Sequence, residues 1–215
     1  MGIRVNGVAV VSVGVSCQAT HQIENHATLI GELVGGKPKH VSAPFDWIIC
    51  PARSAAGMIR DWRFHPSDPA ELIDDQEPYW PQRHCWFWHD AEFLRTGDFL
   101  PRRDHLADNF DRLRQVERTI FILSNTQTNL DTFARSVRHP MEFAFTDEDL
   151  DTVEAALKSR FPNGELWIVA QKGRHALQRR RHDPRVIEFD FHASEWKGDY
   201  AQWSAALRRM LTPAT

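Results

Sequence analysis

Apolar β-branched runs alternate with amphipathic stretches along most of the chain. Short apolar runs at residues 8–13, 119–123, 166–170 and 186–191 are typical of buried strands. Helical spacing of apolar residues predicts helices that begin at residues 17, 52, 102, 147 and 200. Because strands and helices alternate, we expect a three-layer α/β fold, with a mostly parallel sheet and helices on both of its faces.

One segment departs from this alternation. Residues 44–101 are rich in proline, aspartate and tryptophan, and five of the eight tryptophans of the chain lie between residues 46 and 89. We expect residues 1–215 to form a single α/β domain. Residues 44–101 would then be an irregular Trp-rich insertion between the first and second core strands.

The composition is that of a soluble globular protein, with 42% hydrophobic and 26% charged residues. The net charge of -3 argues against non-specific nucleic-acid binding. No apolar run reaches the length of a membrane span, and we expect no membrane partner. The three cysteines, Cys17, Cys50 and Cys85, show no disulfide spacing, so reduced thiols and a cytoplasmic location are expected. The sequence leaves the oligomeric state open.

Cys17 stands where the first strand ends and the first helix begins, after Gly14-Val15-Ser16. A thiol at a helix N-terminus feels the positive end of the macrodipole, which favours the thiolate. The neighbouring backbone amides, including that of Gln18, are suited to receive an oxyanion. Cys17 is therefore either a nucleophile or a buried filler residue.

A cysteine nucleophile needs a base, and His89 is the first candidate. The next residue, Asp90, either orients the imidazole or caps the helix that follows. Asp46 either orients His89 or belongs to a structural network. At strand ends, His192 is an alternative base, and Asn125 is an orienting amide, an oxyanion donor or a plain turn residue.

A basic loop at residues 171–184 includes Arg179, Arg180 and Arg181. It either holds a phosphate or polyanionic ligand or is a solvated loop. The cluster of His84, Cys85 and nearby residues matches no zinc-binding spacing, so no metal is expected. No phosphate-binding glycine loop or dinucleotide fingerprint is present.

Several motifs resemble a bacterial family classed as papain-like cysteine peptidases and of unknown function. They are residues 12–17 (SVGVSC), 44–47 (PFDW), 89–90 (HD) and 196–199 (WKGD), together with Trp203 and the stretch 114–123. This resemblance implies that Cys17 is the nucleophile and His89 the base. The strand–Gly-x-x-Cys-Gln start also resembles coenzyme A-binding capsule-polysaccharide O-acetyltransferases and the first block of SGNH esterases.

Three functions follow as hypotheses. The first is a cysteine-dependent hydrolase of peptide, amide or ester bonds without a cofactor. The second is an acyltransferase that moves an acyl group from coenzyme A to a glycan, with the basic loop holding the cofactor phosphates. The third is a non-catalytic module whose Trp-rich segment binds a ligand or partner. The expected substrate is a small molecule, a peptide or a glycan.

Overall fold

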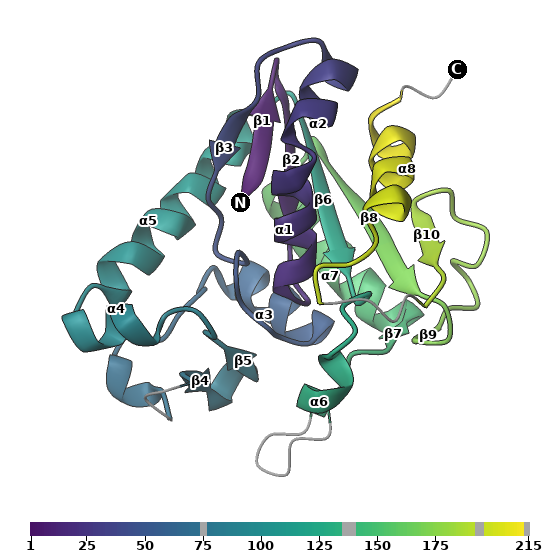
Figure 1. The fold of residues 1–215 in the computed structure, drawn as a ribbon. Coiled ribbons are helices and arrows are strands. Elements are labelled where there is room, and N and C mark those ends of the chain that lie inside the picture. The colour runs from purple at the N-terminus through teal and green to yellow at the C-terminus, as the bar shows by residue number, and fades with distance from the viewer. Residues whose placement is uncertain (74–76, 135–140, 192–195, 213–215) are drawn as a thin grey trace.

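The computed structural model describes residues 1–73, 77–134, 141–191 and 196–212. Its centre is a six-stranded sheet in the order β10-β8-β6-β2-β1-β3 (Figure 1). The four neighbours β10 (Val186–Phe189), β8 (Gly164–Gln171), β6 (Arg118–Ser124) and β2 (Val8–Ser12) are parallel. Strands β1 (Gly2–Val5) and β3 (Lys39–Val41) add an antiparallel edge. The predicted mostly parallel α/β sheet is confirmed.

Helices cover both faces of the sheet, as predicted (Figure 1). One face carries α1 (Cys17–Asn25), α2 (Ala27–Val34) and α8 (Tyr200–Leu211), and the other carries α3 (Ala52–Asp61), α5 (Phe99–Asp111) and α7 (Asp147–Arg160). Val10 of β2 packs with the first set and Val11 with the second. Alternate residues of a strand point to opposite faces, which explains the continuous apolar runs in the sequence.

The antiparallel edge is the part of the sheet that the apolar runs do not predict. β1 pairs with β2 through a tight turn in which Asn6 and Gly7 have φ of 43° and 77°. Two successive positive φ values match the hairpin turn that suits twisted strands. β3 then pairs with the free side of β1, and Ile3 of β1 is fully buried.

Two predicted helices have different boundaries in the structure. The helix predicted to begin at residue 17 ends at Asn25, and α2 follows it after His26, whose φ and ψ are -99° and 16°. The His26 ring bonds to the Gln22 carbonyl and the Ser204 hydroxyl, both at 2.8 Å. The helix expected from residue 102 begins earlier, at Phe99, and ends in a short 3-10 turn, η3 (Arg112–Gln115).

The Trp-rich insertion shares the core of the sheet. It contains α3, η1 (Pro69–Glu71), β4 (Tyr79–Trp80), η2 (Pro81–Arg83), β5 (Cys85–Trp86) and α4 (Ala91–Thr96). Trp80, Trp86 and Phe87 are buried in the same cluster as Val11 and Phe121 of the central strands. The remaining elements are α6 (Leu130–Ala134), β7 (Phe145–Thr146) and β9 (His175–Ala176).

Candidate functional site

Cys17 is the first residue of α1 and lies at the carboxyl end of the parallel strands. Beyond β2 the chain stays beside β6, because Val13 N–H donates to the Ile122 carbonyl at 2.9 Å and Val15 N–H to the Ser124 carbonyl at 3.3 Å. Ser16 has the extended conformation of an N-cap, but its side chain makes no capping bond. The structure thus places Cys17 where the sequence predicts it, at the junction of the first core strand and the first helix.

Cys17 is buried without belonging to the hydrophobic core. Its exposed fraction is 5%, yet it is in neither cluster of packed apolar residues. Ala19 and Ile23 form the sheet-facing stripe of α1. Two residues turn a helix by about 200°, so Cys17 points away from the sheet. A cysteine that filled the core would lie on the stripe of Ala19 and Ile23.

The Cys17 thiol points to a buried amide from the β6–α6 loop. Its Sγ donates to Gln127 Oε1 at 3.5 Å, and the Gln18 backbone N–H donates to the same oxygen at 3.2 Å. The other end of the Gln127 amide donates to Asn129 Oδ1 at 2.5 Å. The Gln127 side-chain oxygen therefore lies beside the Cys17 sulfur and is held by the Gln18 backbone amide, in the first turn of α1. Sequence reasoning did not identify Gln127, because its role depends on how the loop folds back over α1.

Burial raises the pKa of the Cys17 thiol to about 11, although a hydrogen bond from its own backbone amide lowers it. The expectation of a favoured thiolate is therefore wrong for this conformation. Desolvation penalises the charged sulfur by more than this backbone hydrogen bond stabilises it. The thiol is protonated at neutral pH.

Amide side chains join the start of α1 to the WKGD motif. Gln18 accepts a hydrogen bond from Thr126 Oγ1 and donates from Nε2 to the Trp196 carbonyl at 2.7 Å. Gln22 Nε2 donates to the Lys197 carbonyl at 2.5 Å. Gln18 was predicted to contribute to an oxyanion site through its backbone, and that N–H is occupied by Gln127. The adjacent hollow measures about 20 Å³, enough for one water molecule.

His89 lies in the same group of loops as Cys17, but no hydrogen bond joins the two among the described residues. Val15 pairs with Cys50 and Ile49 with Trp86, so segment 47–50 lies between segments 15–17 and 86–89. The His89 ring stands edge-on to Trp47, with centroids 5.2 Å apart. Burial lowers the pKa of His89 more than Asp90 raises it, which keeps the imidazole neutral at pH 7.

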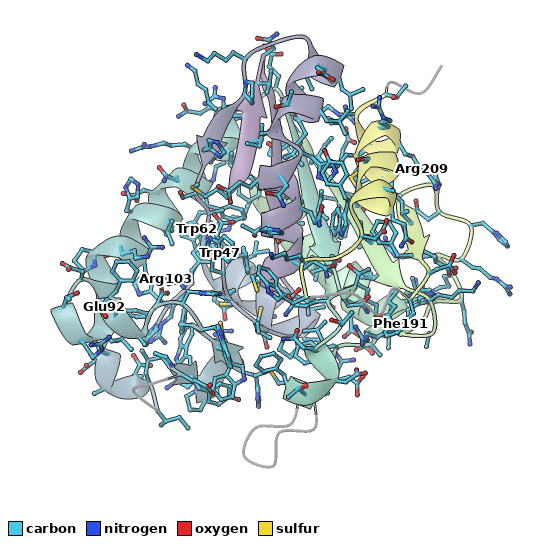
Figure 2. All side chains as sticks on the ribbon, viewed as in Figure 1. Trp47, Trp62, Glu92, Arg103, Phe191 and Arg209 are labelled. Atoms are coloured by element: carbon cyan, nitrogen blue, oxygen red, sulfur yellow. The ribbon has the colours of Figure 1, made fainter. Side chains whose placement is uncertain are left out.

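The two carboxylates predicted near His89 have other partners. Asp90 is 2% exposed and forms an ion pair with Arg103, which itself is 1% exposed and points inward from α5 (Figure 2). It neither orients His89 nor makes a side-chain cap on α4. Asp46 accepts hydrogen bonds from Thr20 Oγ1 at 3.1 Å and from the Ala43 amide at 2.9 Å. Asp46 thus takes the structural role that the sequence left open.

The strand-end candidates are also accounted for. Asn125 Nδ2 donates to the carbonyls of Phe143 and Arg174 at 2.9 and 2.8 Å, and its Oδ1 accepts from the Gln171 amide at 2.9 Å. Its side chain therefore holds the loops at the ends of β6 and β8, and it is not turned toward Cys17. His192 lies outside the described residues.

The structure adds His21 as a candidate base. It lies one helical turn after Cys17, a spacing that places two Cβ atoms roughly 5–6 Å apart. Its ring is 5.0 Å from that of Trp196, and Nε2 bonds to Asn25 Nδ2 at 2.8 Å. Burial, followed by the charge of Lys197, lowers its pKa. The i, i+4 spacing from Cys17 was a signal that sequence reasoning could have used.

The basic loop is largely neutralised by helix α7. Arg179 pairs with Asp151 at 2.5 Å, and Arg180 pairs with both Asp151 and Glu154 at 2.7 and 2.6 Å. Arg181 is exposed. Two of the three arginines predicted to bind an anion are therefore engaged with carboxylates of the chain itself.

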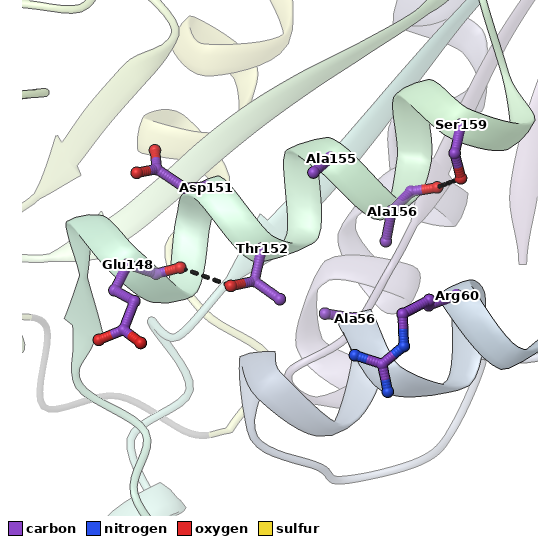
Figure 3. A pocket seen from close by; sticks show the side chains of 8 residues that line it. All are labelled: Ala56, Arg60, Glu148, Asp151, Thr152, Ala155, Ala156 and Ser159. Carbon is purple, nitrogen blue, oxygen red and sulfur yellow. Dashed lines mark hydrogen bonds between the residues drawn. The ribbon is translucent and has the colours of Figure 1, made fainter.

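A cavity of about 470 Å³ between α3 and α7 lies apart from Cys17 (Figure 3). Its lining includes Ala56, Ala155 and Ala156, with Arg60 and Glu148 at the rim. The described residues include no group of three or more histidine, cysteine or acidic side chains arranged to hold a metal ion. Within the same ranges, no helix has the length and hydropathy to cross a membrane.

The fold and site together define a three-layer α/β protein with a buried thiol at the carboxyl edge of its parallel strands. Comparisons with protein families, with curated proteins and with solved structures find no match for this chain.

Proposed function

We propose that the protein is a cysteine-dependent hydrolase in which Cys17 attacks the carbonyl carbon of an ester or amide. The observation that carries this proposal is the convergence of the Cys17 thiol and the Gln18 N–H on one oxygen, Oε1 of Gln127. A substrate carbonyl oxygen in that position would accept the same N–H while its carbon lies beside the sulfur. Negative charge that develops on this oxygen is stabilised by the N-terminus of α1.

A resting thiol with a pKa of about 11 must lose its proton during the attack. In the proposed reaction the Sγ–C bond forms as the proton passes to neutral His89, and the carbonyl electron pair moves to oxygen. Collapse of this intermediate expels the alcohol or amine, which takes the proton from His89. Water, activated by the same imidazole, then hydrolyses the thioester and restores the thiol.

The proposed reaction includes a movement of loops. Residues 49 and 50 lie between Val15 and Trp86, whose backbones are therefore two strand spacings, about 10 Å, apart. Cys17 and His89 follow these two residues along the chain and must approach each other. Gln127 must also withdraw to admit a substrate, because its Oε1 occupies the position beside the Cys17 sulfur and the Gln18 N–H. Closing and opening of loops is a common step in catalysis.

The test is acylation by an aryl ester, such as p-nitrophenyl acetate, followed by peptide mass spectrometry. We expect a burst of nitrophenol and an acetyl group on Cys17, both lost in Cys17→Ala. Cys50→Ala is the matched control, because Cys50 is a second buried thiol of the same chain, and it should keep the burst. Hydrolysis by Cys17→Ala at the wild-type rate, or an acetyl group found only elsewhere, would contradict the proposal.

The base is tested by His89→Gln and His21→Gln. We expect His89→Gln to lower the acylation rate about 100-fold or more. The wild-type rate should increase with pH as the imidazole loses its proton, and this increase should be absent in His89→Gln. His21→Gln should leave both unchanged. The reverse pattern would assign the base to His21, and an unchanged rate in both variants would exclude both residues.

No observation gives the two alternatives comparable support. Transfer from coenzyme A relies on free cations, and Arg179 and Arg180 already pair with carboxylates of α7. A binding module would present its tryptophans at the surface. Trp80 and Trp86 are buried, while Trp88 is 37% exposed.

A further inference from the structure

A second polar cavity, of about 330 Å³, lies at the antiparallel edge of the sheet, away from Cys17. Strands β1 and β3, the end of α5 and the turn η3 contribute its lining. Arg4 of β1 pairs with Ala9 at the start of β2, whereas Cys17 follows the end of that strand. The cavity is therefore separate from the candidate hydrolase site.

The lining of this cavity is basic and contains no carboxylate. The polar residues that line it are Arg4, His40, Ser42, His105, Asn109 and Arg112. Within the described ranges, the Arg112 guanidinium makes a single hydrogen bond, a long one of 3.4 Å to Asn109 Oδ1. The neighbouring carboxylate of Asp111 is engaged by Arg114 at 2.6 Å. Among the described residues, neither Arg4 nor Arg112 has an ion-pair partner, in contrast to Arg179 and Arg180.

The strand register brings a further positive charge to this region. Arg4 lies directly opposite Lys39 in the antiparallel pair of β1 and β3. Side chains of directly opposite residues share one face of the sheet, and like charges there destabilise the pair. The chain as a whole carries a net charge of -3, so this accumulation of positive charge is local. An anion bound beside Arg4 would relieve the repulsion.

We propose that this cavity binds the phosphate group of a small phosphorylated molecule. Guanidinium groups match phosphate oxygens with paired hydrogen bonds, and two of them balance the charge of a dianion. A carboxylate carries a single charge and would leave one arginine unneutralised. The volume falls at the lower end of small-molecule pockets, which begin at roughly 300 Å³, and leaves room for an organic body beside the phosphate.

Isothermal titration calorimetry at constant ionic strength tests this assignment, with inorganic phosphate and glycerol 3-phosphate as probes. We expect both probes to bind the wild-type protein, and Arg4→Gln and Arg112→Gln each to weaken binding at least about tenfold. The matched control is Arg208→Gln, which removes one exposed arginine from α8 with the same change in net charge. Its affinity should equal that of the wild type.

A second variant tests the sign of the charge directly. Asn109→Asp places a carboxylate in the lining and should abolish phosphate binding, while thermal unfolding confirms that the variant is folded. Absence of binding at millimolar phosphate would overturn the proposal, as would equal binding by the wild type and both arginine variants. Acetate that binds as tightly as phosphate would overturn the assignment to a phosphate group.

Discussion

Replacing Gln127 with alanine is expected to make the Cys17 thiol react faster with iodoacetamide. Burial holds the pKa of this thiol at about 11 against an ordinary value of 9.0, and Gln127 contacts its sulfur. The thiolate is the reacting species, and each pKa unit changes its fraction about tenfold below the pKa. Full exposure to water would therefore accelerate alkylation about 100-fold at neutral pH. Because other groups still cover the sulfur, we expect an increase of about tenfold or more.

Peptide mass spectrometry measures the rate separately for each cysteine. Cys50 and Cys85 serve as internal standards, because both are fully buried in the core cluster. Asn129→Ala is the matched control, since it removes the partner of Gln127 Nε2 and leaves the oxygen beside Cys17. The alkylation rate of Cys17 in Asn129→Ala should stay within about twofold of the wild-type rate. A tenfold change corresponds to about 1.4 kcal/mol, so a twofold change corresponds to less than about 0.5 kcal/mol.

Two results would refute this reasoning. An unchanged rate in Gln127→Ala would mean that the loop does not protect the sulfur. In the wild type, the logarithm of the rate should still rise with pH at about pH 9, because the thiol is far from fully ionised there. A rate that levels off near neutral pH would mean that the Cys17 thiolate is stabilised and that its pKa is not raised.

Two further predictions concern charged side chains. Asp90→Asn should lower the free energy of unfolding by about 3–5 kcal/mol, because it leaves the buried Arg103 guanidinium without a countercharge. Urea denaturation measures this free energy, and a loss below about 1 kcal/mol would contradict the prediction. The hydrogen bond from Arg118 lowers the pKa of Glu165 in the folded protein. The ion pair therefore stabilises the fold fully above the pKa of the unfolded carboxyl, about 4.3. This stabilisation is lost as the pH falls through the pKa of Glu165 in the folded protein. Arg118→Gln should therefore destabilise the protein near neutral pH and have little effect at about pH 3, whereas equal losses at both would exclude this ion pair as the cause.

The central sheet was predictable because its strands are buried on both faces. Such strands read as continuous apolar runs, and helices between them force parallel connections. The antiparallel edge has a weaker signal. Asn6-Gly7 is a hairpin turn sequence that reveals β1, whereas β3 consists of Lys39, His40 and Val41 and has no apolar pattern. It becomes a strand because β1 offers a free edge to pair with.

The candidate site was predictable in position and not in chemistry. The strand-to-helix junction locates Cys17, but its pKa is set by burial, and its polar contact is with Gln127, 110 residues away in sequence. Asp46 and Asp90 were each recognised from the sequence as a possible partner of His89. Their partners, Thr20 and Arg103, belong to helices whose relative placement only the folded chain determines.

The hydrogen bonds around Cys17 indicate which group would move to admit a substrate. Gln18 is bonded at both ends of its amide, to Thr126 and to the Trp196 carbonyl, which fixes the 196–199 segment to α1. The Gln127 oxygen instead receives a thiol, which is a weak donor, and an amide at 3.2 Å. A neutral hydrogen bond contributes about 1 kcal/mol net, so releasing the Gln127 oxygen from these two contacts costs about 1–2 kcal/mol. Thr126, in the same β6–α6 loop, is held by Gln18, so the Gln127 side chain is the group expected to move. Its withdrawal would uncover the sulfur and the Gln18 N–H together.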